Sequence, residues 1–401
     1  MQYRTIPKNG DKLSILGFGC MRLPITDGRI DEERAINQIR NAIDNGVNYV
    51  DTAWPYHGGE SEPLLGKALK DGYRDRVKVA TKLPSWMING RGDMDRYIAT
   101  QMKRLETDRI DYYLVHALDG ALWDNVKAHG VLDFLEKAKQ DGRIVNAGFS
   151  FHGEAVDFKR IIDEYAWIFC QIQYNILDQK FQAGTEGLKY AAAKNLGVIV
   201  MEPLRGGNLG LPAQPPAISA IWNEAKTRRS PVEWALRWVW NHPEVTVILS
   251  GMNEETHIKQ NLAIADTAHA GSLSAEELEL VERVSQKYHE LMPVGCTGCG
   301  YCMPCPSGVQ IPKCFDIYNK MHMFGNVDEA KFLYTISVSG VLSNGKPGFA
   351  SECAACGACL EKCPQHIEIP DFLEKVSAEM EGPDLQERLG KARQMFKTEL
   401  K

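Results

Sequence analysis

The stretch GVNYVDTAWPYHGGESEPLLGKAL, residues 46–69, contains the pattern from which the fold can be worked out. Its first part, Val47–Asp51, is rich in β-branched and aromatic residues and predicts a strand that ends in an ionisable side chain. A loop with adjacent glycines follows, and Ser61–Lys67 then predicts a helix. Strand, loop and helix in this order form one βα unit, so the number of such units indicates the fold class.

Seven further runs of this kind occur before about residue 262, separated by amphipathic, charged segments. In the segment 31–46, Ile36, Ile39 and Ile43 recur at helical spacing after an Asp suited to the N-cap, and Gly46 suits the helix end. The eight predicted strands are Leu13–Phe18, Val47–Asp51, Val77–Lys82, Tyr112–His116, Ile144–Ser150, Phe169–Asn175, Val198–Glu202 and Val245–Ser250. Eight βα units predict a closed (β/α)8 barrel, with a doubly wound open sheet as the alternative.

Polar residues at the carboxyl ends of the predicted strands favour the barrel, because in a barrel those ends share one mouth, where active sites lie. An open sheet that binds a dinucleotide typically has a glycine-rich turn after its first strand, and the nearest approach, Gly17–Arg22, lacks the third glycine. The polar positions are Asp51, Lys82, His116, Ser150 and Ser250, with Gln171 inside the sixth run.

Four of the side chains near these strand ends suit proton transfer to a carbonyl oxygen that is being reduced. We expect the Lys82 ammonium to lower the pKa of the Tyr56 phenol. Asp51 would hold Lys82 in an ion pair, and His116 would orient the substrate oxygen. Each of the four has a simpler interpretation when taken singly, such as a packed tyrosine or a helix N-cap, but their placement on successive strands favours a shared catalytic site.

The chain up to about residue 265 resembles the aldo-keto reductase superfamily. The resemblance is carried by Asp51–Tyr56 (DTAWPY) with Gly59–Glu62 (GESE), by Ala80–Lys82 (ATK) and by Asp111–His116 (DYYLVH). It implies a (β/α)8 barrel that binds NAD(P)H at its mouth, with Tyr56 as the proton donor and the other three residues named above completing a catalytic tetrad.

The same resemblance implies a nucleotide site along the strand ends. Ser150 and Gln171 would bind the nicotinamide carboxamide, and Met201 stands where many members stack a tyrosine on the nicotinamide. Phe151 replaces the usual asparagine after Ser150. The phosphate and adenosine end would be held by Ser250, Gly251, His257, Gln260 and Asn261.

His257 stands where an arginine commonly holds the 2′-phosphate of NADPH. Its neighbours Glu254 and Glu255 would repel that phosphate or accept a hydrogen bond from the ribose of NADH. Alternatively, they lie on the first turn of a helix and favour its dipole. We therefore expect weak discrimination between the nucleotides or a modest preference for NADH.

The cysteines predict a second domain, because nine of the eleven fall between Cys296 and Cys363. They include two runs of four, and the second run has the C-x2-C-x2-C-x3-C-Pro spacing of ferredoxins that bind four-iron clusters. Zinc is the alternative, but zinc sites typically use separated C-x2-C pairs. The two runs are Cys296, Cys299, Cys302 and Cys305, and Cys353, Cys356, Cys359 and Cys363.

In ferredoxins with two clusters, the fourth cysteine of each run serves the other cluster. One [4Fe-4S] cluster would then take Cys296, Cys299, Cys302 and Cys363, and the other Cys305, Cys353, Cys356 and Cys359. The first run has two residues rather than three before Cys305, which leaves the assignment of Cys305 open. Cys314 belongs to neither run and is expected to pack inside a helix.

The resulting prediction is an aldo-keto reductase barrel over residues 1–288, followed by a small α-helical, ferredoxin-like domain with two clusters over residues 289–401. The segment between the cysteine runs resembles α-helical two-cluster ferredoxin domains, and barrels fused to such a domain form a recognisable branch of the superfamily. We expect hydride transfer between NAD(P)H and a small carbonyl or alcohol substrate, with a redox partner protein for the clusters.

Two other functions remain open at this point. One is a ferredoxin-linked reductase in which the clusters pass electrons to a flavin or directly to a substrate. The other is an electron-transfer adaptor with a vestigial tetrad. Nicotinamide transfers two electrons as hydride whereas each cluster transfers one, so coupling them normally requires a cofactor that does both.

The net charge and the hydropathy of the chain indicate which classes of partner and which cellular compartment to expect. The formal net charge is −6, from 46 basic and 52 acidic residues, which argues against nucleic acid as a partner. No apolar run reaches the roughly 18 residues that a membrane span needs, and the first twelve residues lack the apolar stretch of a signal peptide. We therefore expect a cytoplasmic protein without a membrane contact.

Overall fold

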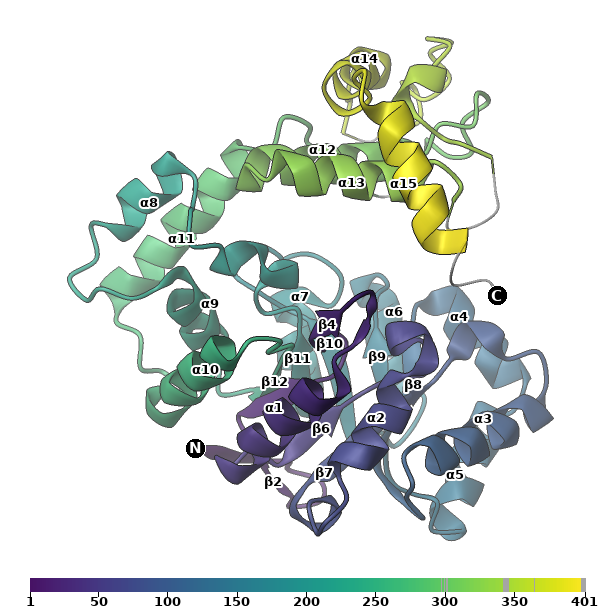
Figure 1. Cartoon of the computed structure of the whole chain (residues 1–401), viewed down its shortest axis with the longest axis vertical. Coiled ribbons are helices and arrows are strands. Elements are labelled where there is room, and N and C mark those ends of the chain that lie inside the picture. The colour runs from purple at the N-terminus through teal and green to yellow at the C-terminus, as the bar shows by residue number, and fades with distance from the viewer. Residues whose placement is uncertain (297, 299, 301, 342–345, 364, 398–401) are drawn as a thin grey trace. The chain divides into compact units, whose positions relative to one another are not determined.

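The computed structural model describes the chain except residues 297, 299, 301, 342–345, 364 and 398–401, and gives the helical backbone alone for 394–397. The chain forms two compact units (Figure 1). The first comprises Met1–Leu211 and Thr227–Val281, and the second comprises Pro212–Lys226 and Glu282–Lys401. Each unit has its own fold, so the two are described separately.

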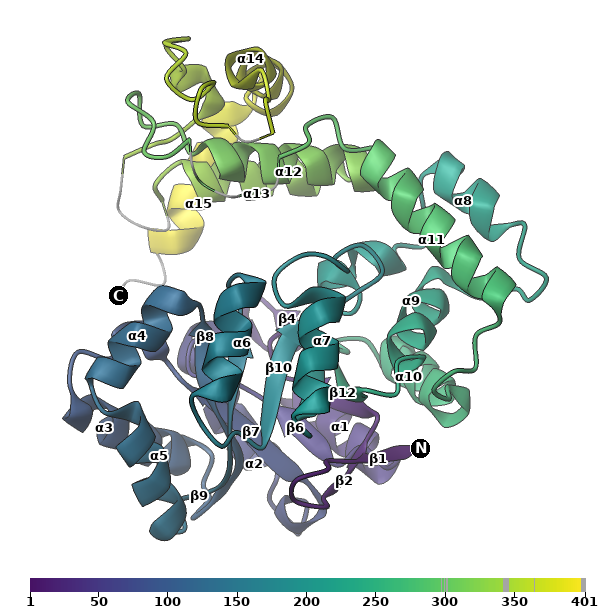
Figure 2. The ribbon, with the colours of Figure 1, turned by 180° about the vertical axis from the view of Figure 1, so that it is seen from behind.

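Eight parallel strands close into a barrel in the first unit (Figure 1, Figure 2). Closure is made where β12 pairs with β3 through Ile248↔Leu16, Leu249↔Gly17 and Ser250↔Phe18, which excludes the open sheet. All eight predicted strands are present. The strands are β3 (Leu16–Gly19), β6 (Tyr49–Asp51), β7 (Lys78–Leu83), β8 (Ile110–Leu118), β9 (Ile144–Phe151), β10 (Phe169–Gln173), β11 (Gly197–Met201) and β12 (Val245–Ser250).

The run predicted as one strand over Leu13–Phe18 is divided into two. β2 (Lys12–Ser14) pairs antiparallel with β1 (Tyr3–Thr5), and only β3 enters the barrel. The division falls at Ser14, whose hydroxyl donates to the carbonyl of Leu16 at 2.7 Å. Apolar, buried residues lie on both sides of Ser14, so the break leaves little trace in the sequence. A second short hairpin follows, β4 (Ile25–Thr26) with β5 (Arg29–Ile30).

Helices surround the barrel (Figure 2), and the first of them matches its prediction. The Asp31 carboxylate accepts from the backbone N–H of Arg34 at 3.2 Å as the N-cap, Ile39 and Ile43 are buried, and Gly46 follows the helix with φ 95°. The helices of this unit are α1 (Glu32–Asp44), α2 (Ser61–Ala68), α3 (Arg91–Arg104), α4 (Gly120–Ala128), α5 (Val131–Gln140), α6 (Ala155–Asp163), α7 (Gly184–Ala193), α9 (Pro231–Trp240) and α10 (Glu255–Thr267).

Aromatic side chains fill the barrel interior. The rings of Tyr49 and Tyr112 lie 5.3 Å apart and those of Tyr112 and Phe169 lie 4.9 Å apart, each pair edge to face. All three side chains are fully buried. The barrel is therefore a packed core, and its polar residues gather at the carboxyl ends of the strands.

The second unit is helical and has its own apolar core. Cys314 is fully buried in that core, as predicted for a helix-packing residue. The elements are α8 (Pro216–Trp222), the part of α11 (Ala275–Glu290) that follows Val281, α12 (Ile311–Phe324), α13 (Val327–Val338), α14 (Ile369–Met380) and α15 (Leu385–Lys397), with a 3-10 turn, η5 (Ala350–Glu352).

A domain boundary after residue 288 falls inside α11, and the second unit also includes Pro212–Lys226. Two contacts explain why this earlier segment belongs there. Tyr288 donates a hydrogen bond to Gln214, and Arg283 pairs with Glu224 at 2.6 Å. Neither contact has a signal in the sequence.

None of the helices in the described part of the chain combines the length and the apolar character needed to cross a bilayer.

A close contact between α2 and α3 gives a test of the barrel packing. A Cβ on Gly66 would lie 2.8 Å from the carbonyl oxygen of Arg104, whereas a Cβ on Gly92 would meet nothing within 4 Å. Gly66→Ala should therefore cost about 1–3 kcal/mol of unfolding free energy, while Gly92→Ala is neutral or stabilises by up to about 1 kcal/mol.

Urea unfolding followed by tryptophan fluorescence measures this difference. The signal reports on the barrel unit, since seven of the eight tryptophans, all except Trp222, lie there. Equal unfolding free energies for the two variants would contradict the close approach.

Candidate functional site

Lys82, at the carboxyl end of β7, is the side chain around which the barrel mouth is organised. Its Nζ lies 2.5 Å from Asp51 Oδ1, 2.8 Å from the carbonyl oxygen of Thr52 and 3.4 Å from the Tyr56 hydroxyl. Burial lowers the pKa of the fully buried Lys82, but Asp51 and Tyr56 outweigh it and raise that pKa above its usual value. Lys82 is therefore held as an ammonium with three acceptors around it.

Asp51, the last residue of β6, is held from both sides. Gln171 Nε2 donates to Asp51 Oδ2 at 3.1 Å, opposite the bond to Lys82. Burial raises the pKa of Asp51, and the Lys82 ammonium opposes that rise. Because both carboxylate oxygens have a donor, the ion pair is fixed in one geometry.

Tyr56 begins a 3-10 turn, η1 (Tyr56–Gly59), in which His57 and Gly58 take left-handed φ values of 52° and 65°. The phenol of Tyr56 lies against Lys82, whose Nζ is 4.9 Å from the ring centroid. Burial raises the pKa of Tyr56, and the lowering by Lys82 is smaller. The prediction that the pKa of Tyr56 is lowered is therefore wrong for the protein without ligands. The sequence did not show that this side chain is buried. The phenol is protonated at neutral pH.

His116 on β8 completes the group. Its ring lies 6.2 Å from that of Tyr56 and 5.1 Å from that of Trp86, which belongs to a second turn, η3 (Ser85–Met87). Burial, followed by the charge of Lys82, lowers the pKa of His116 well below its usual value, so the imidazole is neutral. The structure thus brings together the four side chains expected to converge at the mouth.

A buried network behind Lys82 was missed by the sequence analysis. Glu62 on α2 is fully buried and accepts from Gln101 Nε2 at 2.7 Å and from Arg104 at 3.1 Å. Gln101 Nε2 also donates to the Lys82 carbonyl at 3.0 Å, and the Arg104 guanidinium lies 3.9 Å from the ring centroid of Trp54. In the sequence, the only sign of this network was Glu62 as part of the GESE motif. The motif does not show that its side chain is buried.

The residues expected at the nicotinamide end lie beside this group. Ser150 on β9 and Gln171 on β10 are paired partners in the sheet, so their side chains are neighbours. The Ser150 hydroxyl accepts from the N–H of Ala117 at 2.7 Å. Met201, half-buried at the end of β11, pairs with Gln173.

The residues expected at the adenosine end divide into two groups. Ser250 ends β12 and its hydroxyl accepts from Asn261 Nδ2 at 3.0 Å, with Gly251 directly following. His257 and Gln260 lie exposed on α10. The structure therefore joins Ser250 with Asn261 and places the other two side chains in solvent.

Glu254 and Glu255 have a role that neither expectation included. Both carboxylates pair with Arg34 of α1 at 2.6 Å, and the hydrogen bonds of Glu255 to Arg34 and then to Gln38 lower the pKa of Glu255 to about 2. Arg34 offsets the negative charge that was expected to repel a 2′-phosphate. A contact across 220 residues of chain has no local signal in the sequence.

Cysteines line two pockets in the second unit. The first measures about 380 Å³ and the second about 320 Å³, both including space open to solvent. Cys302 lines both, and Cys299 lies outside the described residues. Besides Cys302, the first pocket is lined by Cys305, Cys353, Cys356 and Cys359, and the second by Cys296 and Cys363.

Four thiols that line the first cysteine pocket interact electrostatically. Burial and the neighbouring thiols, first Cys353 and then Cys305 and Cys356, raise the pKa of Cys359, so the four groups lie near one another. Yet among the described residues no three Cys, His, Asp or Glu side chains are close enough to share one metal ion. Zinc needs its sulfurs about 3.8 Å apart, at Zn–S bonds of about 2.3 Å. A four-iron cluster is larger, and each thiolate binds its own iron.

Comparison with known proteins agrees with both parts. Residues 15–286 match the aldo/keto reductase family, and residues 295–368 match a 4Fe-4S dicluster domain. The chain is thus an oxidoreductase of barrel type with an iron–sulfur domain after the barrel. It belongs to the aldo/keto reductase family.

Individual relatives resemble the barrel. L-galactose dehydrogenase of Arabidopsis thaliana is 26% identical over 314 residues, covering 73% of this chain and 96% of that protein. Aldo-keto reductase YhdN of Bacillus subtilis is 28% identical over 288 residues, covering 63% and 85%. Among solved structures, the holo form of aldo-keto reductase AKR11C1 from Bacillus halodurans aligns with a TM-score of 0.60 at 25% identity, covering 71% of this chain and 96% of that one.

The buried ion pair predicts an asymmetric effect on stability. Asp51→Asn leaves the Lys82 ammonium buried without its counter-charge and should cost about 3–5 kcal/mol of unfolding free energy. Adding Lys82→Met removes the unpaired charge and should restore most of that loss. Urea unfolding of the single and double variants measures both, and a double variant less stable than Asp51→Asn would rule out this account.

Proposed function

We propose that the barrel transfers hydride between NAD(P)H and a small carbonyl or alcohol substrate, with Tyr56 as the proton donor. The observation that carries the proposal is the chain of contacts from the Tyr56 hydroxyl through Lys82 to Asp51, at 3.4 and 2.5 Å. A tyrosine hydroxyl placed against a buried ammonium is suited to proton transfer, and packing alone would not require this arrangement. The completeness of this chain argues against a vestigial site.

Each residue then has one task in carbonyl reduction. Bound NAD(P)H supplies the hydride to the carbonyl carbon. Tyr56 gives its proton to the carbonyl oxygen, and Lys82 stabilises the phenolate that remains. Neutral His116 donates a hydrogen bond that orients the oxygen. Alcohol oxidation reverses these steps, and the name of the relative L-galactose dehydrogenase supports that direction as well.

The strand ends beyond the tetrad fit a nucleotide. A carboxamide needs both donors and acceptors, and the hydroxyl of Ser150 and the amide of Gln171 are adjacent side chains on β9 and β10. Met201 would lie against the nicotinamide in place of an aromatic ring. The residues proposed for the phosphates and adenosine are Ser250, Gly251, His257, Gln260 and Asn261.

We further propose two [4Fe-4S] clusters that transfer electrons, in the crossed arrangement. The pocket linings support it, because Cys363 of the second run lies with Cys296, and Cys305 of the first run lies with Cys353. The ligand sets are Cys296, Cys299, Cys302 and Cys363 for one cluster, and Cys305, Cys353, Cys356 and Cys359 for the other. A bound flavin, which can take up hydride and release single electrons, would connect the clusters to hydride chemistry, whereas a partner that accepts single electrons would serve the clusters alone.

Tyr56→Phe tests the proton donor. It should lower kcat for aldehyde or ketone reduction by about a hundredfold or more with nucleotide affinity unchanged. Tyr73→Phe is the control, since that hydroxyl bonds to Asp44. Because burial raises the pKa of Tyr56, the phenol should keep its proton at neutral and moderately alkaline pH, so the wild-type kcat/KM for reduction should stay level there and fall only at more alkaline pH. Reduction at the wild-type rate by Tyr56→Phe would remove Tyr56 from the mechanism.

Metal analysis tests the clusters. Protein prepared without oxygen should contain about eight irons and eight acid-labile sulfides per chain. Cys356→Ser should lose about half of them, whereas Cys314→Ser, in the helical core, should keep the full number. Stoichiometric zinc without visible absorbance would refute the cluster assignment, and flavin absorbance would favour the flavin-dependent alternative.

A further inference from the structure

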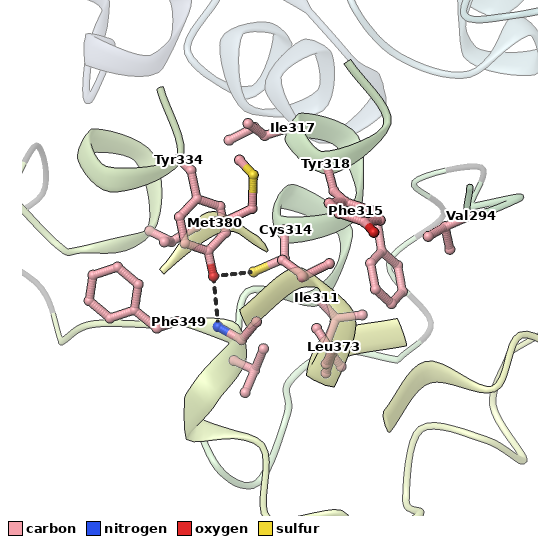
Figure 3. Close-up of a cluster of buried hydrophobic side chains, with 14 of the residues drawn as sticks. Val294, Ile311, Cys314, Phe315, Ile317, Tyr318, Tyr334, Phe349, Leu373 and Met380 are labelled. Atoms are coloured by element: carbon pink, nitrogen blue, oxygen red, sulfur yellow. Dashed lines mark hydrogen bonds between the residues drawn. The ribbon is translucent and has the colours of Figure 1, made fainter. Parts of the chain in front are cut away.

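A buried tyrosine on α13 holds the turn that precedes the second cysteine run. The Tyr334 side chain is fully buried, and its hydroxyl donates to Glu381 Oε1 at 2.6 Å and accepts from the N–H of Ala350 at 2.9 Å. Glu381 Oε1 also accepts from the N–H of Ser351 at 3.1 Å. Figure 3 shows the Tyr334 hydroxyl bonded both to that backbone nitrogen and to the sulfur of Cys314.

The two N–H groups belong to η5, the turn from which Cys353 follows. The first N–H groups of a helical turn have no partner within it and need one from outside when they are buried. Ala350 is 1% exposed, so its partner must come from the protein. The turn then passes to Cys353, whose N–H bonds to the carbonyl of Ala350 at 3.1 Å. Tyr334 and Glu381 thus fix the backbone that places Cys353.

The same segment also holds the chain that follows Cys305. The carbonyl of Gly348 accepts from the N–H of Gln310 at 3.0 Å, and the N–H of Gly308 bonds to the carbonyl of Cys305 at 2.9 Å. A Cβ on Gly348 would lie 2.9 Å from the Gly308 oxygen, so the two strands of chain are in close contact. The segment 348–353 therefore contacts the chain that follows Cys305 and leads directly to Cys353, and both of these cysteines line the first pocket.

The second pocket is held by different residues. Asn319 on α12 accepts from the N–H of Val294 at 3.0 Å and donates to its carbonyl at 2.7 Å, two residues before Cys296. Among the described residues, no hydrogen bond joins Tyr334 or Glu381 to this segment. The segment before Cys296 is therefore held by a residue other than Tyr334 and Glu381.

We propose that Tyr334 and Glu381 are positioning residues for one cluster only, the one bound by Cys305, Cys353, Cys356 and Cys359. The inference rests on the cluster assignment proposed above. Tyr334→Phe leaves the Ala350 N–H buried without an acceptor and removes a donor from Glu381. The turn then no longer fixes the sulfur of Cys353, and both the retention of the cluster and its reduction potential depend on that sulfur.

The experiment follows both clusters in one protein. Full-length Tyr334→Phe is prepared without oxygen, iron release to a chelator is timed, and each cluster is titrated by electron paramagnetic resonance. About half of the iron should leave roughly tenfold faster or more, and the potential of one cluster should shift while that of the other stays unchanged. Wild-type release and potentials, or equal effects on both clusters, would overturn the proposal.

Two variants separate positioning from general destabilisation. Tyr318→Phe breaks a tyrosine–glutamate bond of the same kind, to Glu379 Oε1 at 2.5 Å, between α12 and α14. It should leave iron release unchanged. Glu381→Gln keeps an acceptor oxygen and should retain the cluster better than Glu381→Ala, whereas equal losses in these two would contradict the proposal.

A wrong cluster assignment and a wrong positioning proposal would give different results in these experiments. If the assignment is wrong, wild-type protein has fewer than about eight irons or Cys356→Ser keeps its full number. If the assignment is right and the positioning is wrong, those two results stand and Tyr334→Phe behaves as the wild type.

Discussion

The barrel site depends on one buried ion pair. The side chains of Lys82 and Asp51 are only 1% and 3% exposed, and removing two charges from water costs several kcal/mol per ion unless their geometry is close and their other bonds are filled. Neighbouring strands meet this condition, because β6 and β7 are paired at Asp51↔Ala80 and Gln171 fills the second oxygen of Asp51. The phenol of Tyr56 then lies against an ammonium held by its ion pair, an arrangement that suits the proton transfer proposed for Tyr56.

The strands and the convergence of polar strand ends could be predicted, since both depend on local periodicity and on how any parallel barrel closes. Burial could not be predicted at the level of single groups. The direction of the Tyr56 pKa shift was wrong for this reason, although the effect of Lys82 has the expected sign. The pairing of Arg34 with Glu255 was invisible as well, because it joins two helices at opposite ends of the barrel sequence.

In the second unit, too, features that depend on local sequence could be predicted, and contacts between distant residues could not. The crossed assignment made from the spacing remains a prediction that the pocket linings support. Cys305, Cys353, Cys356 and Cys359 line one pocket, Cys296 and Cys363 line the other, and Cys302 lines both. What holds the runs in place is not local: Tyr334 and Glu381 are 47 residues apart, and they meet at η5. Glu62 acts similarly behind Lys82. In both units a carboxylate identified only in the fold, buried Glu62 and half-buried Glu381, belongs to the hydrogen-bond network that supports the backbone of the proposed site.

The combination of these units sets a condition on electron flow. A hydride contains two electrons, and the two proposed clusters, each accepting one, would match it in number. The two kinds of transfer are nevertheless different, because a cluster cannot accept hydride and nicotinamide seldom releases single electrons. In the proposed mechanism, neutral His116 and protonated Tyr56 would act on a proton and an oxygen atom, and neither side chain would convert hydride to single electrons. A carrier able to do both therefore has to link the two chemistries, or each unit works with a partner of its own.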